Sequence, residues 1–317
     1  MQKLSVRLQI DAIQSPVQPP DSIGPGMGLF PSHRWISHRL SDLARAEPAR
    51  EIGKATDCPF RYARALPLHR IILWNASPLT VGSKVVIDGD EAHHALRVKR
   101  VATGDEVELL DGKGQRAKAR VGETSKQGKA TWKFEAEVIE SHLEPHPEVR
   151  LEVLAAAAKG DRLDEMLESL SQLGVDQFRP LLSDHVIVDP REAKLERLRR
   201  AALESTKQCG RSWPIEVGEP VDLQQAMKEL DGVFACVADA SGSHKIDIPK
   251  ETKRVIVFVG PEGGWSPREF EGFRARKLPF IRCAPHVLRV ETAAIAAATM
   301  LINHSSLRRY TQGETGI

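Results

Sequence analysis

The chain has 317 residues, enough for about two domains, and its 41% hydrophobic and 28% charged residues exclude a wholly disordered protein. A formal net charge of +2 neither requires nor excludes nucleic acid, so the distribution of the charge has to decide. The four cysteines form no CxxC pair, which favours free thiols and a cytoplasmic protein. No run approaches the ~20 apolar residues of a membrane span, so we expect no membrane segment.

Residues 1–67 differ from the rest of the chain. They include the Pro- and Gly-rich run SPVQPPDSIGPGMGLFP and show little sustained periodicity, which predicts a flexible N-terminal extension. A weak amphipathic signal in HRWISHRLSDLARA leaves an organelle-targeting leader as the alternative. We assign this segment no chemistry.

Residues 68–145 are predicted to form a small β domain. Runs such as RIILWN, SKVVIDG and WKFEAEVIES are rich in strand-forming residues and are separated by Gly, Asp and Asn turn signals. One insertion, GDEAHHALRVKRV, has the apolar spacing of a short helix. The prolines of LEPHPEV then indicate a linker.

Residues 149–310 alternate between strand-like and helix-like runs. In GDRLDEMLESLSQLG the apolar residues share one helical face, with Asp161 as the expected N-cap and Gly174 as the expected stop. The run DPREAKLERLRRAALESTKQCG has the same organisation, from a capping box that begins at Asp189 to Gly210. This alternation favours parallel strands with helices on both faces of the sheet.

A glycine-rich loop interrupts the run VFVGPEGGWSPREF at the end of a predicted strand. Its glycines allow another molecule to approach the backbone, and Ser266 with Glu269 forms a capping box for the next helix. Ligands usually bind at such loops in open α/β sheets, although an ordinary tight turn is the alternative. No Gly-Lys-Ser/Thr follows and Glu262 would repel phosphate, so we expect a ligand with positive charge or sugar hydroxyls.

A second loop, within CAPHVLRVETAAIAAATM, places Arg289 and Glu291 at the start of another helix. Alone, this pair is as consistent with a structural ion pair as with an active-site element. Because the loop follows a second strand of the same predicted sheet, we treat both residues as candidate catalytic groups.

Together, VFVGPEGGWSPREFE and LRVETAAIAA resemble the signature of the ribosomal RNA small subunit methyltransferase E family, in the SPOUT class of S-adenosylmethionine-dependent RNA methyltransferases. The likeness covers most of residues 69–305. The family's PUA-like RNA-binding module is resembled by DGDEAHHALRVKRVATGDEVELLDGKG. Its middle segments are resembled by AAKGDRLDEMLESLSQLGVDQFRPLLSDHVIV and by ESTKQCGRSWP. The resemblance implies a small PUA-like β-barrel domain followed by a SPOUT-type α/β domain tied in a trefoil knot. It also implies a homodimer that methylates N3 of a uridine in small-subunit (16S) ribosomal RNA, in the assembled subunit.

The resemblance further implies that S-adenosylmethionine is held by both loops. The residues expected to bind it are Val259, Gly260, Pro261, Glu262, Gly263, Gly264, Cys283, Ala284, Pro285, Val287 and Leu288. The family commonly has Leu, Gly, Arg and Thr at positions where this chain has Cys283, Ala284, His286 and Val290. Loss of the Arg and of the Thr hydroxyl puts the finer substrate contacts in question.

Catalysis of this kind depends on positioning and on stabilising a developing uracil anion. Arg289 is the residue we expect to hydrogen-bond a uracil carbonyl and favour the deprotonated base. Glu291 would orient Arg289 or accept the N3 proton, and we favour orientation because a helix N-terminus lowers carboxylate basicity. Glu262 would contact the cofactor or shape its loop.

Two basic surfaces are candidates for contact with RNA. One is the HHALRVKR run and the other is the helix and turn at 191–211, although a solvated helix face is the plain alternative for the second. The residues expected to contact RNA are His93, His94, Arg97, Arg100, Lys207 and Arg211. A metal site from Asp90, Glu91, His93 and His94 is disfavoured because adjacent histidines rarely reach one ion, so we predict no metal.

Two other functions compete with the methyltransferase. A non-catalytic RNA-binding protein would keep the β domain and the basic helix but would not need both loops. An unrelated nucleotide-binding α/β enzyme would need a loop that accepts phosphate, which Glu262 opposes. Binding of S-adenosylmethionine separates the methyltransferase from both.

Overall fold

The computed structural model describes residues 68–74, 78–127, 131–158, 160–186 and 192–304. The predicted extension at 1–67 and the start of the predicted capping box at Asp189 lie outside the described residues. Within the described ranges, none of the helices is both long enough and apolar enough to cross a membrane.

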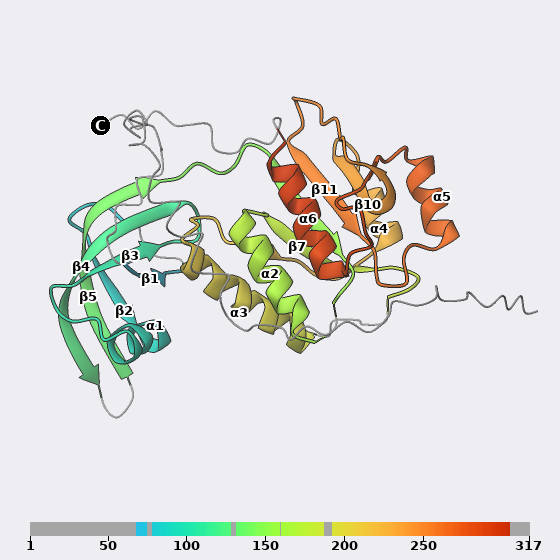
Figure 1. Cartoon of the computed structure of the whole chain (residues 1–317). Coiled ribbons are helices and arrows are strands. Elements are labelled where there is room, and N and C mark those ends of the chain that lie inside the picture. Colours follow the sequence, from blue (N-terminus) through green and yellow to red (C-terminus); the bar gives the residue numbers. More distant parts are fainter. Residues whose placement is uncertain (1–67, 75–77, 128–130, 159, 187–191, 305–317) are drawn as a thin grey trace, which may run out of the picture. The chain divides into compact units, whose positions relative to one another are not determined.

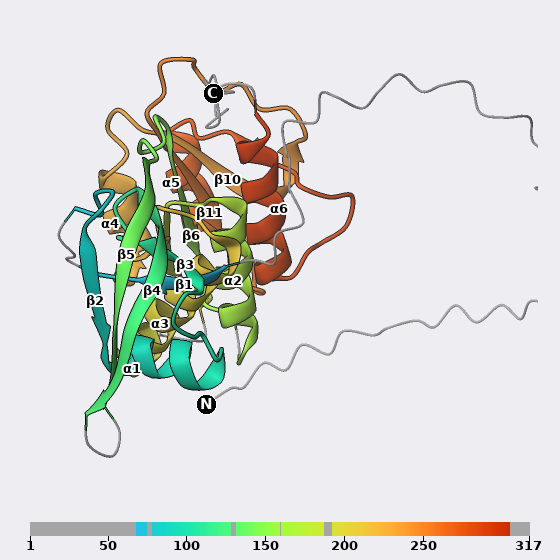
Figure 2. The same cartoon turned by 90° about the vertical axis from the view of Figure 1, so that its left-hand side faces the viewer.

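The β domain is a curved five-stranded sheet with the order β1-β3-β4-β5-β2. Its strands are β1 (His69–Ile72), β2 (Lys84–Asp88), β3 (Glu106–Leu110), β4 (Gln115–Gln127) and β5 (Thr131–Leu143). Strand β1 pairs with β3 in parallel and the other three pairs are antiparallel. Figure 2 shows β4 and β5 as a long curved hairpin, which encloses a core that includes Ile71, Leu109 and Phe134.

The predicted short helix is present in the β domain. It begins as α1 (Gly89–His93) and continues through the π-helical segment η2 (His94–Val98). Ala92 and Ala95 are buried, while Arg97 and Arg100 are exposed, so the apolar spacing in GDEAHHALRVKRV does mark the face that packs on the sheet.

The α/β domain contains a seven-stranded sheet with the order β12-β10-β11-β6-β7-β8, in which β9 also pairs with β7. Every pair in this sheet is parallel. The strands are β6 (Arg150–Ala155), β7 (Gln177–Leu182), β8 (Glu216–Val217), β9 (Val221–Asp222), β10 (Phe234–Ser243), β11 (Arg254–Val259) and β12 (Phe280–Ile281).

Helices cover both faces of this sheet, as the alternation of strands and helices predicts (Figure 1). One face packs against α2 (Arg162–Leu173), α3 (Glu192–Cys209) and α6 (Val290–Ile302), and the other against α4 (Leu223–Lys228) and α5 (Pro267–Ala275). Consecutive residues of β6 divide between the two cores, with Val153 in the first and Leu154 in the second.

Most helix ends match the sequence signals. Ser266 and Glu269 form the complete capping box of α5, and Gly174 ends α2 in the left-handed region with φ 91°. Asp161 occupies the N-cap position of α2 but makes no capping hydrogen bond, and its carboxylate lies 3.7 Å from Arg197 instead. The sequence analysis did not identify the short elements β8, β9 and α4.

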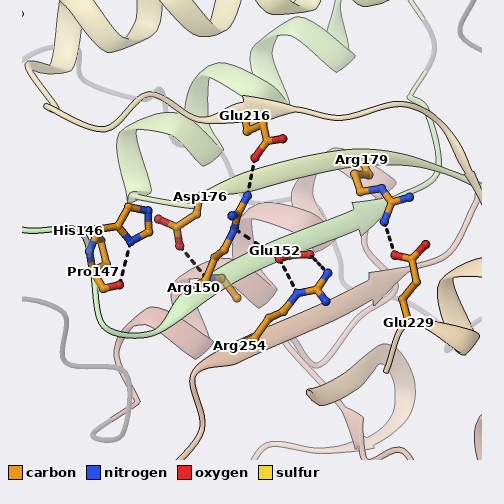
Figure 3. Close-up of polar contacts among 10 residues, drawn as sticks. His146, Pro147, Arg150, Glu152, Asp176, Arg179, Glu216, Glu229 and Arg254 are labelled. Carbon is orange, nitrogen blue, oxygen red and sulfur yellow. Dashed lines mark hydrogen bonds and ion pairs between the residues drawn. The ribbon is translucent and has the colours of Figure 1, made fainter. Parts of the chain in front are cut away.

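A network of ion pairs joins the amino ends of neighbouring strands (Figure 3). The carboxylate of Glu152, which is 1% exposed, accepts two hydrogen bonds of 2.7 Å from Arg254 and lies 3.5 Å from Arg150. Arg150 also contacts Glu216 in β8. Because this network is at the amino edge of a parallel sheet, we interpret it as structural, and the opposite edge is left for ligands.

Candidate functional site

A cavity of about 230 Å³ lies at the carboxyl edge of the parallel sheet, where β11 and β12 end beside residues 238–240 of β10. The glycine loop after β11 and the loop between β12 and α6 both line it. All residues predicted to bind the cofactor line this cavity except Gly263 and Pro285, namely Val259, Gly260, Pro261, Glu262, Gly264, Cys283, Ala284, Val287 and Leu288. Two loops that are separated in the sequence by α5 and β12 therefore form one site.

The glycines of the first loop are needed for different reasons. A Cβ on Gly260 would lie 2.9 Å from the ring of Trp265, which is 7% exposed and belongs to the core beneath the loop. Gly264 has φ +70°, a conformation that residues with a side chain rarely adopt. The loop is thus pressed against its own core, and its backbone is uncovered toward the cavity.

The segment after β7, to which the sequence analysis gave no role in the site, contacts this loop and the start of α5. After β7, Asp184 accepts a 2.6 Å hydrogen bond from the Ser266 hydroxyl, and its backbone N–H donates to the Glu269 carboxylate at 2.9 Å. The imidazole Nδ1 of His185 lies 3.0 Å from the carbonyl oxygen of Gly264. Because a carbonyl only accepts, this contact requires a proton on Nδ1. Asp184 and His185 could have been noticed in the sequence, because polar residues that closely follow a strand of a parallel sheet often lie at its ligand-binding edge.

The side chains at the first turn of α5 determine which ligands the site accepts. The Ser266 hydroxyl accepts a hydrogen bond from the backbone N–H of Glu269, and the Glu269 carboxylate accepts one from the backbone N–H of Ser266, so these N–H groups are not available to a ligand. The carboxylates of Glu269 and Asp184 also place negative charge behind the loop. Glu262 adds a third, exposed carboxylate at the cavity itself. At the first turn of α5 a phosphate would meet occupied N–H donors and negative charge, whereas a sulfonium or ribose hydroxyls would be favoured there. Arg282 also lines the cavity, after β12.

The second loop contributes a thiol and an exposed apolar side chain. Burial raises the pKa of the Cys283 thiol, which lines the cavity, and burial raises that of Cys236 in β10 still more. Val287 is 89% exposed at the cavity rim. His286 also lines the cavity and is exposed.

Arg289 and Glu291 lie next to the cavity at the start of α6, but neither lines it. Arg289 is the N-cap residue and its side chain is exposed. The carboxylate of Glu291, 16% exposed, lies 3.8 Å from the guanidinium of Arg162 at the start of α2. The partner that the structure gives Glu291 is therefore Arg162, a residue that the sequence analysis did not single out.

The residues predicted to contact RNA fall into two groups. His93, Arg97 and Arg100 are exposed, and the Arg97 guanidinium lies over the Trp132 ring at 5.6 Å. Arg100 has φ 59°, so it turns the chain out of the helical segment. His94 stacks on His69 with ring centroids 5.5 Å apart.

Lys207 and Arg211 have contacts within the chain. Lys207 forms ion pairs with Glu91 at 2.6 Å and with Glu204 at 2.9 Å, and Arg211 donates to the carbonyl oxygens of Ser171 and Val175. Arg211 thereby holds the end of α2, where backbone carbonyls lack helical partners. The ion pair with Glu91 joins the end of α3 to the β domain.

Across the described ranges, no group of three or more His, Cys, Asp or Glu side chains is placed to hold a metal ion.

Comparisons with known proteins match both parts of the chain. Residues 144–302 match a family model described as RNA methyltransferase domain, and residues 87–129 match one described as RNA methyltransferase PUA domain. The ribosomal RNA small subunit methyltransferase E of Aquifex aeolicus is 27% identical over 226 residues, which cover 70% of this chain and 95% of that protein. The protein of the same name from Synechocystis is 26% identical and covers 70% of this chain and 73% of its own length.

A solved structure supports the same assignment of the fold. The crystal structure of a ribosomal RNA small subunit methyltransferase E from Neisseria gonorrhoeae, bound to S-adenosyl methionine, superposes with a TM-score of 0.66 and 25% sequence identity. The superposition covers 74% of this chain and 97% of that protein. The β domain and the α/β domain are thus both included in the likeness.

Proposed function

Because the chain belongs to the RNA methyltransferase family whose domain model matches residues 144–302, we propose that it transfers a methyl group from S-adenosylmethionine to N3 of a uridine in small-subunit ribosomal RNA. The observation that carries the proposal is the cavity at the carboxyl edge of the sheet, which both predicted loops line. Its bare glycine backbone and its carboxylates suit a cationic, hydroxyl-bearing cofactor and oppose a phosphate.

The fold agrees with this function. The α/β domain has the SPOUT-type methyltransferase fold and is preceded by a PUA-like β domain, as the sequence predicts. We propose that the domains extend over 68–145 and 149–310. The trefoil knot stays a prediction, and it is supported by the meeting of the loops at 260–266 and 282–289 in one cavity.

The residues that would bind the cofactor are those of the two loops. S-adenosylmethionine, when bound, supplies a methyl group that is already activated on a sulfonium. Gly260 and Gly264 would let it approach the backbone, and the carboxylate of Glu262 would accept from a hydroxyl or face the cationic part. Gly263 packs behind the loop, where an added Cβ would lie 3.1 Å from the Cβ of His185.

Arg289 is the group we propose for the uracil. Its guanidinium is exposed beside the cavity and is free to hydrogen-bond a carbonyl oxygen, which favours the deprotonated base needed at N3. Glu291 would act with Arg162 and Arg289 in one charged group at the start of α6, and its carboxylate would orient the guanidinium groups or accept the N3 proton.

We propose that the partner is small-subunit ribosomal RNA in the assembled subunit, in the cytoplasm, and that the chain acts as a homodimer. The exposed residues His93, Arg97 and Arg100 would contact the RNA, with His94 beside them. Lys207 and Arg211 would contribute mainly by holding α3 and α2 in place, because their donors are engaged within the chain.

The test is transfer of labelled methyl from S-adenosylmethionine to small ribosomal subunits whose RNA lacks base methylation. Nuclease digestion and chromatography of the nucleosides should give N3-methyluridine. Label in another nucleoside would overturn the assignment of the target atom. A protein that binds this RNA but transfers no label would be the non-catalytic RNA-binding alternative.

A further inference from the structure

Trp74, which follows β1 in the β domain, presents its indole to solvent. The residue is 53% exposed, while Trp132 and Trp213 are partly buried and Trp265 is 7% exposed. Among the tryptophans that the structure describes, Trp74 alone is exposed. A side chain of this size normally contributes its apolar area to a core or to an interface.

The indole is supported from behind by a glycine. Gly112, in the tight loop between β3 and β4, has φ +70°, and a Cβ added to it would lie 2.5 Å from the Trp74 ring. Only a residue without a side chain allows the ring to lie this close to the loop backbone. The loop backbone thereby restricts the exposed ring on one side, which lowers the conformational entropy that is lost when a partner binds.

The ring borders a cavity of about 310 Å³ with an apolar floor. The floor consists of Ala202 and Leu203 of α3 and of Pro214, Ile215 and Val217 before and within β8. A volume of this size is at the lower end of the ~300–1,000 Å³ of small-molecule sites. It is suited to one planar group of the size of a nucleobase.

The cavity is bordered by arginines, one of which has no acidic partner among the residues that the structure describes. Arg199 and Arg200 both line it. Arg199 pairs with Glu196 at 2.6 Å and with Glu219, whereas Arg200 is exposed and forms no ion pair within the described part of the chain. Lys113, directly after Gly112, is exposed as well. An aromatic ring, an apolar floor and unneutralised cations form the combination that binds an unpaired base together with its phosphates.

We propose that Trp74 and the adjoining cavity form a second RNA site, in which an unpaired base of the substrate RNA stacks on the indole and Arg200 contacts a neighbouring phosphate. The site is formed by Trp74 of the β domain, by α3 and by the segment at 214–217, and it is separate from the cofactor cavity, with which it shares no lining residue. This inference rests on the proposed function, since it assumes an RNA substrate. It adds a contact that none of the residues singled out from the sequence provides.

The test measures binding of a fluorescently labelled single-stranded RNA of mixed sequence by anisotropy, with the full chain. Replacing Trp74 by Ala should weaken binding by about 5- to 100-fold, the range expected when one stacked base is lost. Trp74→Phe should retain most of the affinity, because a ring remains. Arg200→Ala should weaken binding less and reduce the slope of log Kd against log salt by about 1. Lys250→Ala, an exposed lysine away from this cavity, is the control for loss of one charge.

Two further measurements keep the outcomes distinct. The affinity of each variant for S-adenosylmethionine should be unchanged, which shows that the variant is folded and that the proposed function is intact. RNA should quench the fluorescence of the natural protein more than that of Trp74→Phe, and this comparison does not need the Ala variant to fold. An unchanged RNA affinity of Trp74→Ala, or equal quenching in both proteins, overturns the inference even if the enzyme methylates RNA. Failure of the natural protein to bind S-adenosylmethionine would instead count against the proposed function.

Discussion

The Ser266 hydroxyl donates a 2.6 Å hydrogen bond to the carboxylate of Asp184, and this contact ties the segment after β7 to the first turn of α5. Ser266 also caps α5, so one side chain both starts the helix and fixes the outer wall of the glycine loop. The geometry of the cofactor cavity therefore depends on a residue pair that does not line it.

Ser266→Ala should lower the free energy of unfolding by about 1–2 kcal/mol, because a helix cap is lost and Asp184 loses its donor. Urea denaturation measures the change. Ser169→Ala is the matched control, since its hydroxyl only bonds the carbonyl of Glu165 within α2; it should change stability by less than about 0.5 kcal/mol. Equal midpoints for the two variants would contradict the role of the Ser266 contact.

Gly260→Ala and Gly272→Ala should change stability in opposite directions. A Cβ on Gly260 would lie 2.9 Å from the Trp265 ring, so the loop or the ring must move, at a cost of about 1–3 kcal/mol, and cofactor affinity should fall. A Cβ on Gly272, inside α5, meets nothing within 4 Å and should stabilise the helix by up to about 1 kcal/mol. Thermal unfolding distinguishes the two. If Gly260→Ala bound the cofactor with the affinity of the natural protein, the claim that position 260 must lack a side chain would be contradicted.

Cys283 should react slowly with iodoacetamide, and bound S-adenosylmethionine should protect it. The thiol lines the cavity and burial raises its pKa, so the reactive thiolate forms only at higher pH than in a free cysteine. Cys209 is exposed and provides the unprotected reference, while Cys236 is buried and should not react. Peptide mass spectrometry after timed labelling reports all three. Equal labelling of Cys283 with and without the cofactor would place the ligand elsewhere.

The protein should lose stability as the pH falls from about 6.5 toward 4, partly through His69. Burial, followed by the positive charge of His94, Lys99 and Lys207, lowers the pKa of His69 to about 4 in the folded state. A lowered pKa means that the unfolded chain binds the proton first, so the contribution is complete above pH 6.5 and is lost as the pH drops. His69→Gln should reduce the change in Tm between pH 7 and pH 5. An identical pH dependence in both proteins would show that His69 does not contribute.

Arg289→Ala should abolish methyl transfer and leave the affinity for S-adenosylmethionine within about threefold, because the guanidinium is exposed at the N-cap and does not line the cavity. Arg268→Ala, on the exposed face of the first turn of α5, is the matched control and should remain active. Calorimetry and single-turnover transfer to RNA separate binding from chemistry. A fully active Arg289→Ala enzyme would end the catalytic assignment.

Local signals predicted much of the fold and of the cavity. The alternation of strands and helices, the capping box at Ser266 and the stop at Gly174 are each determined by a few neighbouring residues, and the structure confirms them. Glycines that follow a strand indicated the first loop for the same reason. The strands β8 and β9, with two residues each, and the short helix α4 carry too little periodicity to be recognised.

The parts that sequence analysis missed are contacts between distant segments. Glu291 forms an ion pair with Arg162, more than 100 positions away, and Asp184 contacts Ser266 at a separation of 82 residues. Lys207 was assigned from the basic composition of its helix, yet Glu91 of the β domain neutralises it. Composition counts charges, but only the tertiary structure shows which of them are already paired.

The central claim is that the cavity between the two loops binds S-adenosylmethionine. Titration calorimetry of the full chain with S-adenosylmethionine, and in parallel with ATP and NAD, tests it directly, with Gly260→Ala as the variant that perturbs the loop. The account predicts binding of S-adenosylmethionine in the micromolar range, weaker binding to the variant and none of ATP or NAD. Binding of ATP or NAD without S-adenosylmethionine, or no binding of any of the three with RNA present, would contradict it.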